Sequence, residues 1–130
     1  MKLLTKLLSN LAKQSKRKIS SVQLKKQISI YRWLLYGFRE VVRQHIELDE
    51  SIFRTGGTQN ESIMLEHEEI KSDIDNVILL AENSIAYKLR GKVLNKCAFD
   101  ISEGVNRICK SIRMHMTEED RLLKKNQSEI

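Results

Sequence analysis

The chain places its apolar side chains at the spacing of an α-helix over most of its length. Between residues 20 and 46 they recur at steps of four and three positions, which keeps them on one helix face. The positions on this face are Leu24, Ile28, Tyr31, Leu35, Phe38 and Val42. We therefore predict a central helix from about residue 20 to residue 50, capped by Ser20 or Ser21. Gly37, inside this helix, is predicted to let another helix approach closely.

The same spacing predicts two more long helices, over about residues 61–89 and 92–116. Gly56 and Gly57, with polar residues around them, indicate the loop before the first of these helices, and Gly91 marks its end. The predicted core positions are Ile63, His67, Ile70, Ile74, Val77, Ala81 and Ile85, then Leu94, Ala98, Ile101, Val105, Ile108 and Ile112.

These patterns predict an all-α fold, an antiparallel helical bundle of three long helices plus a short amphipathic N-terminal helix. The chain has no proline, which favours long helices, and short connections make neighbouring helices antiparallel. We divide the chain into a basic N-terminal arm (1–18), the helical bundle (19–116) and a short helical turn with a frayed tail (117–130). Thr117, followed by three acidic residues, is predicted to cap that final turn.

Residues 1–13 form a short amphipathic pattern that needs a surface to lie on, because a helix of this length is marginal alone in water. The leucines expected to meet that surface are Leu4, Leu7, Leu8 and Leu11. The surface could be the rest of the protein, a membrane or the groove of a protein partner. The segment also has the acid-free composition of a mitochondrial presequence, although arginine is scarce in it.

Neither cysteine is expected to form a disulfide. On one helix, Cys97 and Cys109 would lie about 18 Å apart, whereas a disulfide requires Cα atoms within about 7 Å. We therefore predict two free, mostly buried thiols in a reducing, cytoplasmic compartment, with peripheral attachment to a membrane as an alternative. No apolar run approaches the roughly 18 residues that a membrane span needs.

Charge is strongly segregated along the chain. Residues 1–39 hold ten basic and no acidic residues, whereas residues 47–82 hold ten acidic and two basic ones. At about 100° per residue, the central helix brings one set of side chains together beside its apolar face, which we call the basic row. It consists of Lys25, Arg32, Tyr36, Arg39 and Arg43. Arginine forks bind phosphate oxygens, and aromatic rings stack on unpaired bases.

The basic first third is therefore predicted to bind a polyanion, through the backbone phosphates of RNA or single-stranded DNA and without sequence preference. The predicted contacts are Lys13, Lys16, Arg17, Lys18, Lys25, Lys26, Arg32, Tyr36, Arg39 and Arg43. Two other interpretations of the basic row stay open. It could pair with the acidic segment 61–75, within or between chains, or it could be an ordinary solvated surface.

The sequence indicates no catalytic, cofactor or metal site. It lacks a nucleophile elbow, a glycine-rich phosphate loop, paired cysteines with zinc spacing and the H-E-x-x-H motif. Two histidines have a carboxylate four residues on, His45 with Asp49 and His115 with Glu119, and each pair could form half a metal site. We interpret these as solvated or helix-supporting pairs, and His67 as a satisfied histidine at the edge of the core.

Residues 86–105 resemble the phosphotransfer segment of histidine-containing phosphotransfer domains, which are four-helix bundles. Arg90 and Gly91 stand for the Lys-Gly pair of that segment, but Tyr87 stands where the phosphorylated histidine belongs. Because no phosphohistidine can form there, we expect no phosphotransfer.

The sequence as a whole predicts a non-enzymatic accessory or regulatory protein. Its basic first third would hold a nucleic acid, and its acidic or apolar faces would hold a protein partner or another copy of the chain. The alternatives are a peripheral membrane protein anchored by residues 1–13 and a purely structural assembly subunit. Membrane binding would depend on the leucines, whereas nucleic-acid binding would depend on the basic row.

Overall fold

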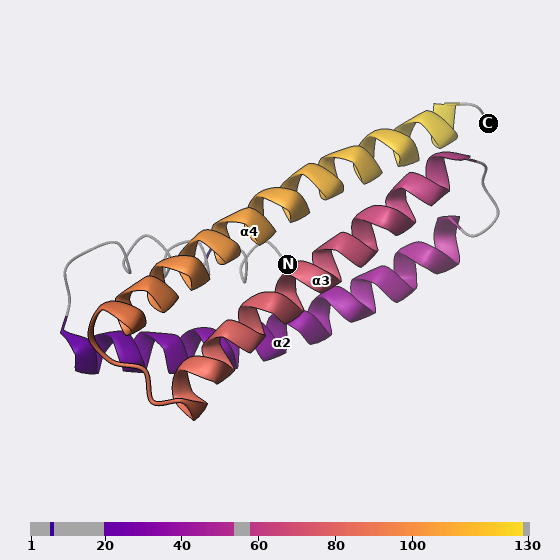
Figure 1. Cartoon of the computed structure of the whole chain (residues 1–130). Coiled ribbons are helices and arrows are strands. Elements are labelled where there is room, and N and C mark those ends of the chain that lie inside the picture. The colour runs from indigo at the N-terminus through magenta and orange to yellow at the C-terminus, as the bar shows by residue number, and fades with distance from the viewer. Residues whose placement is uncertain (1–5, 7–19, 54–57, 129–130) are drawn as a thin grey trace.

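The computed structural model describes Lys6, residues 20–53 and residues 58–128. Within these residues the elements are α2 (Ser21–Phe53), α3 (Thr58–Ala86) and α4 (Gly91–Ser128), and no strand is present (Figure 1). The prediction of an all-α fold with three long, packed helices is confirmed. The predicted N-terminal helix lies outside the described residues, together with the predicted contacts Leu4, Leu7, Leu8, Leu11, Lys13, Lys16, Arg17 and Lys18.

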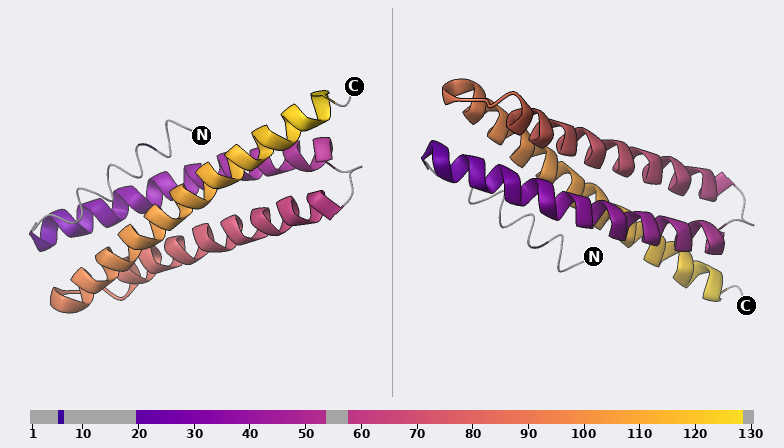
Figure 2. Two further views of the ribbon diagram at one scale, coloured as in Figure 1. Left: turned by 90° about the horizontal axis from the view of Figure 1, so that it is seen from above. Right: turned by 90° about the horizontal axis from the view of Figure 1, so that it is seen from below.

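Successive helices run in opposite directions, and α3 packs along both of the others (Figure 1). Views from above and below show α4 crossing the α2–α3 pair diagonally, from the C-terminal end of α3 toward the C-terminal end of α2 (Figure 2). None of the three helices contains the uncharged apolar stretch that a membrane crossing requires. The bundle therefore has two ends at which all three helices come together.

Side chains and backbone groups define the ends of the helices. At the start of α2, Gln23 N–H donates to Ser20 Oγ and Ser20 N–H donates to Gln23 Oε1, both at 3.3 Å, which is a reciprocal cap. At the end of α3, Leu89 N–H donates to the Ser84 carbonyl at 3.1 Å and Lys88 N–H to the Ile85 carbonyl at 3.3 Å. This pair of bonds is a Schellman motif, and it places Lys88 at a φ of 50°, where glycine is usual.

Two predicted helix ends are wrong. Helix α3 ends at Ala86, three residues before the predicted end at about residue 89, because the Schellman motif turns the chain at Lys88. Helix α4 continues unbroken past Thr117 to Ser128, so no new helix starts there. The Thr117 hydroxyl donates to the Arg113 carbonyl at 2.9 Å, four residues back within the same helix, instead of capping a free N–H.

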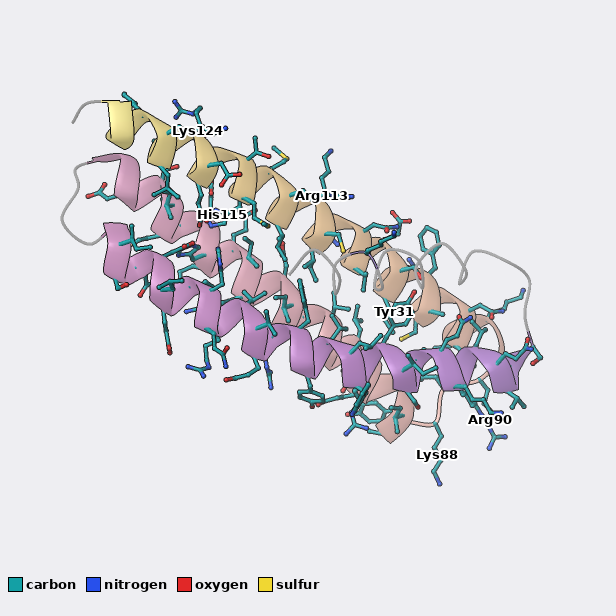
Figure 3. The ribbon with its side chains drawn as sticks, turned by 180° about the vertical axis from the view of Figure 1, so that it is seen from behind. Tyr31, Lys88, Arg90, Arg113, His115 and Lys124 are labelled. Atoms are coloured by element: carbon teal, nitrogen blue, oxygen red, sulfur yellow. The ribbon has the colours of Figure 1, made fainter. Side chains whose placement is uncertain are left out.

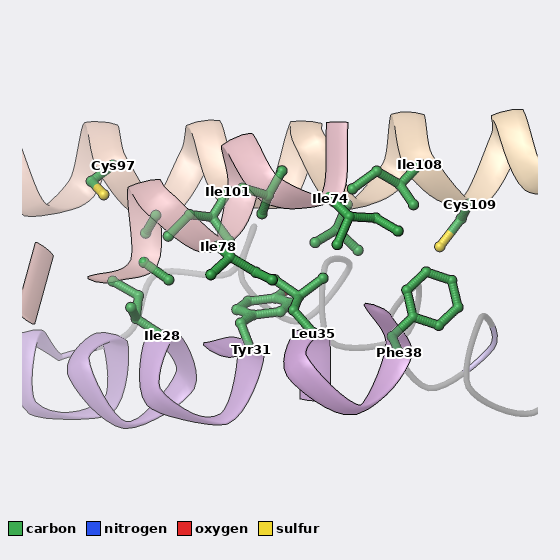
Figure 4. Packing of buried hydrophobic residues seen from close by; sticks show 14 of the residues in the cluster. Ile28, Tyr31, Leu35, Phe38, Ile74, Ile78, Cys97, Ile101, Ile108 and Cys109 are labelled. Atoms are coloured by element: carbon green, nitrogen blue, oxygen red, sulfur yellow. The ribbon is translucent and has the colours of Figure 1, made fainter. Parts of the chain in front are cut away.

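The predicted apolar stripes meet in one core along the length of the bundle (Figure 4). All six predicted positions of α2 and all six of α4 are buried. Tyr31, Leu35 and Phe38 of α2 are at most 1% exposed and lie opposite side chains of α3 and α4. In α3 the stripe is buried up to Ala81, but Ile85 is 41% exposed because it reaches the last turn of the helix.

Both thiols are free and buried on α4, as predicted. Burial raises the pKa of Cys97 and of Cys109, so both are held as protonated thiols at neutral pH. Cys97 Sγ donates to the Leu80 carbonyl of α3 at 3.5 Å. These are the properties of packing residues rather than of reactive nucleophiles.

The close approach predicted at Gly37 occurs at Gly104 instead. No heavy atom of the described residues outside the helix's own neighbouring backbone lies within 4 Å of a Cβ built on Gly37. A Cβ built on Gly104 would lie 2.5 Å from Cγ2 of Val77, so α3 and α4 pack closely here because α4 has no side chain at this position.

Replacing each glycine with alanine should therefore have opposite effects. We expect Gly104→Ala to lower the free energy of unfolding by about 1–3 kcal/mol, since Val77 is buried and must be displaced. Gly37→Ala should raise it by about 0.5–1 kcal/mol, because alanine is the better helix former and meets no obstacle. Urea unfolding of both variants measures the difference, and equal effects would contradict the close approach at Gly104.

Candidate metal centre

Six polar side chains from three helices converge near the end of the bundle where α2 ends and α3 begins. We call them the His–carboxylate cluster. Helix α2 provides His45 and Asp49, α3 provides Glu66 and His67, and α4 provides His115 and Glu119. The cluster lies between all three helices, with His115 on the inner side of α4 (Figure 3).

The nitrogen and oxygen atoms of this cluster lie close to one another. Asp49 Oδ2 is 3.0 Å from His45 Nε2, 3.2 Å from His67 Nε2 and 3.6 Å from His115 Nε2. The Nε2 atoms of His67 and His115 are 3.0 Å apart.

Glu119 turns its two oxygens toward different histidines. Its Oε2 lies 3.2 Å from His45 Nε2, and its Oε1 lies 3.6 Å from His67 Nε2 and forms an ion-pair contact with His115 Nε2. His67 Nδ1 is buried and makes no hydrogen bond to the described residues. One carboxylate thus joins all three histidines of the chain.

The cluster is buried inside the bundle. Asp49, His67, His115 and Glu119 are each at most 6% exposed, whereas the side chains of His45 and Glu66 are 27% and 37% exposed and form the rim. A separate apolar contact between Ile63 and Leu122 lies one turn beyond the cluster along α3 and α4. The polar side chains therefore interrupt the core and are covered by apolar groups on both sides along the bundle axis.

Hydrogen bonds inside the cluster shift pKa values in opposite directions. Burial acts to raise the pKa of Asp49, but bonds from His115 and His67 hold that pKa well below its usual range. Burial acts to lower the pKa of His115, but bonds to Asp49, Glu119 and Glu66 raise that pKa to about 10. Burial acts to lower the pKa of His67, but its bonds to Asp49 and Glu119 together raise that pKa. Without a bound cation, His115 therefore keeps its proton at neutral pH.

These distances match the edges of a metal coordination shell. With metal–ligand bonds of about 2.0–2.2 Å, neighbouring ligand atoms lie about 2.8–3.6 Å apart in octahedral or tetrahedral geometry. One donor atom from each of His45, Asp49, His115 and Glu119 can be chosen so that all four lie within 4.8 Å of one another. Glu66 Oε2 lies 2.5 Å from the other ring nitrogen of His115, Nδ1, where a carboxylate orients a metal-bound histidine.

The interpretation of the two histidine–carboxylate pairs as solvated is wrong. Both pairs continue the apolar register of their helices, since His45 and Asp49 follow Phe38 and Val42 at steps of three and four. His115 and Glu119 likewise follow Ile112, and His67 follows Ile63. That register was the available signal, because it places these polar residues on the faces that turn toward the inside of the bundle. His67 is buried as predicted, but in the centre of the cluster rather than at the edge of the core.

The basic row is partly neutralised by carboxylates. Arg39 Nη1 lies 3.2 Å from Asp75 Oδ1 on α3, and Arg43 pairs with Glu40 and Glu47 on its own helix. Arg32 and Arg39 place their guanidinium carbons 5.8 and 5.0 Å from the centre of the Tyr36 ring. The Arg39–Asp75 contact agrees with the alternative that the basic row pairs with the acidic segment 61–75 of the same chain.

No protein-family model matches the chain, and no curated protein or solved structure shows significant similarity to it, so neither the resemblance of residues 86–105 nor any other family assignment gains support.

Proposed function

We propose that this protein binds a first-row transition-metal ion in the His–carboxylate cluster. The observation that carries the proposal is the convergence of three histidines and two carboxylates from three helices, with neighbouring nitrogen and oxygen atoms mostly 3.0–3.6 Å apart. The ion would contact α2 and α4 through His45, Asp49, His115 and Glu119, and α3 through His67. It would hold together one end of the bundle.

The type of donor atom favours particular metals. Imidazole nitrogen suits iron, cobalt, nickel, copper and zinc, whereas Mg²⁺ and Ca²⁺ prefer sites made only of oxygen. The cysteines do not contribute, because Cys97 and Cys109 lie within the apolar core. Since the two Glu119 oxygens face different histidines, this carboxylate could also bridge a second ion. We therefore expect at least one ion per chain, bound by mixed nitrogen and oxygen ligands.

The competing explanation is a buried network of ion pairs with protons on the histidines. Such a network needs good geometry for every member to offset desolvation. Here Nδ1 of His67 is buried without a hydrogen bond to the described residues, so the protonated network leaves a polar group unsatisfied.

Titration with Co²⁺ tests the proposal directly. The full chain, without a histidine tag and stripped with a chelator, should bind Co²⁺ or Zn²⁺ in one or two equivalents, measured by elemental analysis after dialysis. The visible spectrum of bound Co²⁺ should differ from that of the hydrated ion, since protein ligands replace water. If neither ion is retained and the spectrum stays that of free Co²⁺, the metal proposal is wrong.

A neighbouring pair of glutamates provides a matched control. Glu119→Gln should greatly weaken metal binding because it removes a ligand charge. Glu118→Gln should leave binding unchanged, since Glu118 pairs with Arg121 on the surface of the same helix. Glu66→Gln should weaken affinity about 10–100-fold, as expected for a group that orients a ligand.

Polyanion binding by the basic first third is our second proposal. The favouring observation is Trp33, which is 76% exposed and offers a ring for stacking on an unpaired base. It follows Arg32 in the sequence and comes about two helical turns after Lys26 on α2. No ion pair joins Lys26 or Arg32 to a carboxylate among the described residues. The pairing of Arg39 and Arg43 reduces the number of cations available to a nucleic acid, so we expect a weaker interaction than the sequence alone suggested.

The salt dependence of single-stranded DNA binding tests this second proposal. Each phosphate contact contributes about 0.7–0.9 to the slope of log K against log salt concentration. The double variant Lys26→Gln/Arg32→Gln should therefore reduce the slope by about 1.5. Trp33→Ala should weaken the binding of single-stranded DNA more than the binding of duplex DNA. An unchanged slope in the double variant would contradict the assignment of these contacts.

A further inference from the structure

At the end of the bundle opposite the His–carboxylate cluster, the three helices enclose a cleft. Its volume is about 250 Å³. Its apolar walls include Ile28 of α2 and Leu94 of α4, which are both buried. Three cationic side chains surround it, namely Lys25 from α2, Lys88 from the turn after α3 and Arg90 from the start of α4. We call it the cationic cleft, and Figure 3 shows Lys88 and Arg90 at this end, away from His115.

The cationic cleft has no acidic lining residue. Among the described residues, none of its three cations forms an ion pair, in contrast to Arg39 and Arg43 farther along α2. The negative end of α3 also adds little repulsion there, because the carbonyls of Asn83, Ser84 and Ile85 already accept hydrogen bonds from the turn. An anion entering the cleft would thus meet three positive charges with no carboxylate beside them.

Lys88 occupies a backbone conformation that an L-residue adopts only at a cost. Its φ of 50° is the left-handed position of the Schellman motif, where glycine is strongly preferred. A lysine at this position therefore weakens the turn that joins α3 to α4. Strained residues of this kind concentrate at functional sites, and Lys88 is one of the residues that line the cationic cleft.

We propose that the cationic cleft binds a small phosphate monoester. A phosphate monoester carries about −1.5 to −2 charges at neutral pH, which suits three cations better than a single carboxylate does. Arg90 can hold two phosphate oxygens with its planar fork, while Lys25 and Lys88 act as point charges. The apolar wall then accepts the organic group. Because 250 Å³ lies below the roughly 300–1,000 Å³ of drug-sized sites, that group must be small.

Phenyl phosphate is a suitable probe, with inorganic phosphate and a single-stranded DNA oligonucleotide for comparison. Calorimetry should use the full chain with chelator present, so that phosphate binding to a metal at the other end does not contribute. Phenyl phosphate should bind more tightly than inorganic phosphate, because only the ester buries an apolar group. Arg90→Gln should weaken its binding about tenfold or more, as expected for the loss of a charge-assisted contact.

Lys88→Gly separates loss of the site from loss of the fold. Glycine relieves the strained backbone, so this variant should unfold at a higher temperature than the unchanged protein. Its affinity for phenyl phosphate should nevertheless fall about tenfold or more, because one positive charge is lost. Lys110→Gln is the matched control. It removes one exposed charge from α4 outside the cleft and should leave affinity unchanged.

Three results would overturn this proposal. The first is no binding of phenyl phosphate at millimolar concentration. The second is an equal loss of affinity in Lys110→Gln, which would mean that net charge alone attracts the anion. The third is binding of the oligonucleotide but not of phenyl phosphate, which would assign these cations to nucleic acid instead.

Discussion

A bound transition-metal ion should make the protein markedly more stable. An ion that binds only the folded chain adds about 4 kcal/mol to the free energy of unfolding at a free concentration 1,000 times its dissociation constant. The effect should be large because the ligands come from three helices, so unfolding separates them completely. Thermal unfolding with Zn²⁺ and with a chelator measures the difference, with Glu119→Gln as the variant that should lose it.

The same thermal unfolding experiment should show two opposite pH dependences. One is that of the stability of the metal-free protein, and the other is that of the stability gained from the metal. The folded pKa of His115 is raised to about 10, against about 6.5 in an unfolded chain. In the metal-free protein, its stabilising contribution is therefore complete below about pH 6.5 and is lost as the pH rises toward 10. The lowered pKa of Asp49 acts at the other extreme, since its contribution is lost as the pH falls below about 3.8.

Metal ions compete with these protons. Because a histidine must lose its proton to become a ligand, the gain in stability from Zn²⁺ should increase between pH 6 and pH 8 while the metal-free protein becomes less stable. A metal-induced gain that shrinks over this range would show that the ion binds elsewhere. His115→Gln should reduce both pH effects, since glutamine neither titrates nor provides the imidazole ligand.

Phe38→Ala should produce the second large effect, a loss of about 3–5 kcal/mol in the free energy of unfolding. The Phe38 side chain is fully buried in the centre of the core (Figure 4), so its removal loses apolar burial and leaves a cavity. Urea unfolding of the chelator-treated protein measures the core without a contribution from metal. The midpoint should fall while the slope of free energy against urea stays unchanged.

Trp33→Ala is the matched control, because it removes a larger aromatic side chain from the same helix. Trp33 is 76% exposed, so we expect its loss to change stability by no more than about 0.5 kcal/mol. Comparable losses in the two variants would mean that the described face of α2 is not the one that packs in solution.

The two ends of the bundle differ in the kind of charge that they concentrate. The His–carboxylate cluster has an excess of buried negative groups once its histidines lose their protons, whereas the cationic cleft is lined only by positive ones. The apolar core lies between them. A metal ion at one end and a phosphate ester at the other would each tie α2, α3 and α4 together, so binding at either end should stabilise the same three-helix packing.

The sequence by itself determined the helices and their buried faces. The positions from Leu24 to Val42 and from Leu94 to Ile112 are buried as their spacing predicts, because the helix period and the burial of apolar surface act locally along each segment. The loop predicted at Gly56 and Gly57 lies outside the described residues. Gly91, which was predicted to end α3, is instead the first residue of α4. The end of α3 could not be predicted from the sequence. The Schellman motif that ends this helix has Lys88, and not the usual glycine, at its left-handed position.

Only the tertiary structure decided where polar groups meet. The spacing of His45 and Asp49, or of His115 and Glu119, shows that two groups share a face of one helix, but not which groups on the other helices stand opposite. That depends on the crossing and vertical register of three helices, which packing sets through contacts such as Gly104 against Val77. Contacts between residues distant in sequence, such as His67 with His115, follow from that register, and the local periodicity of the sequence does not predict them.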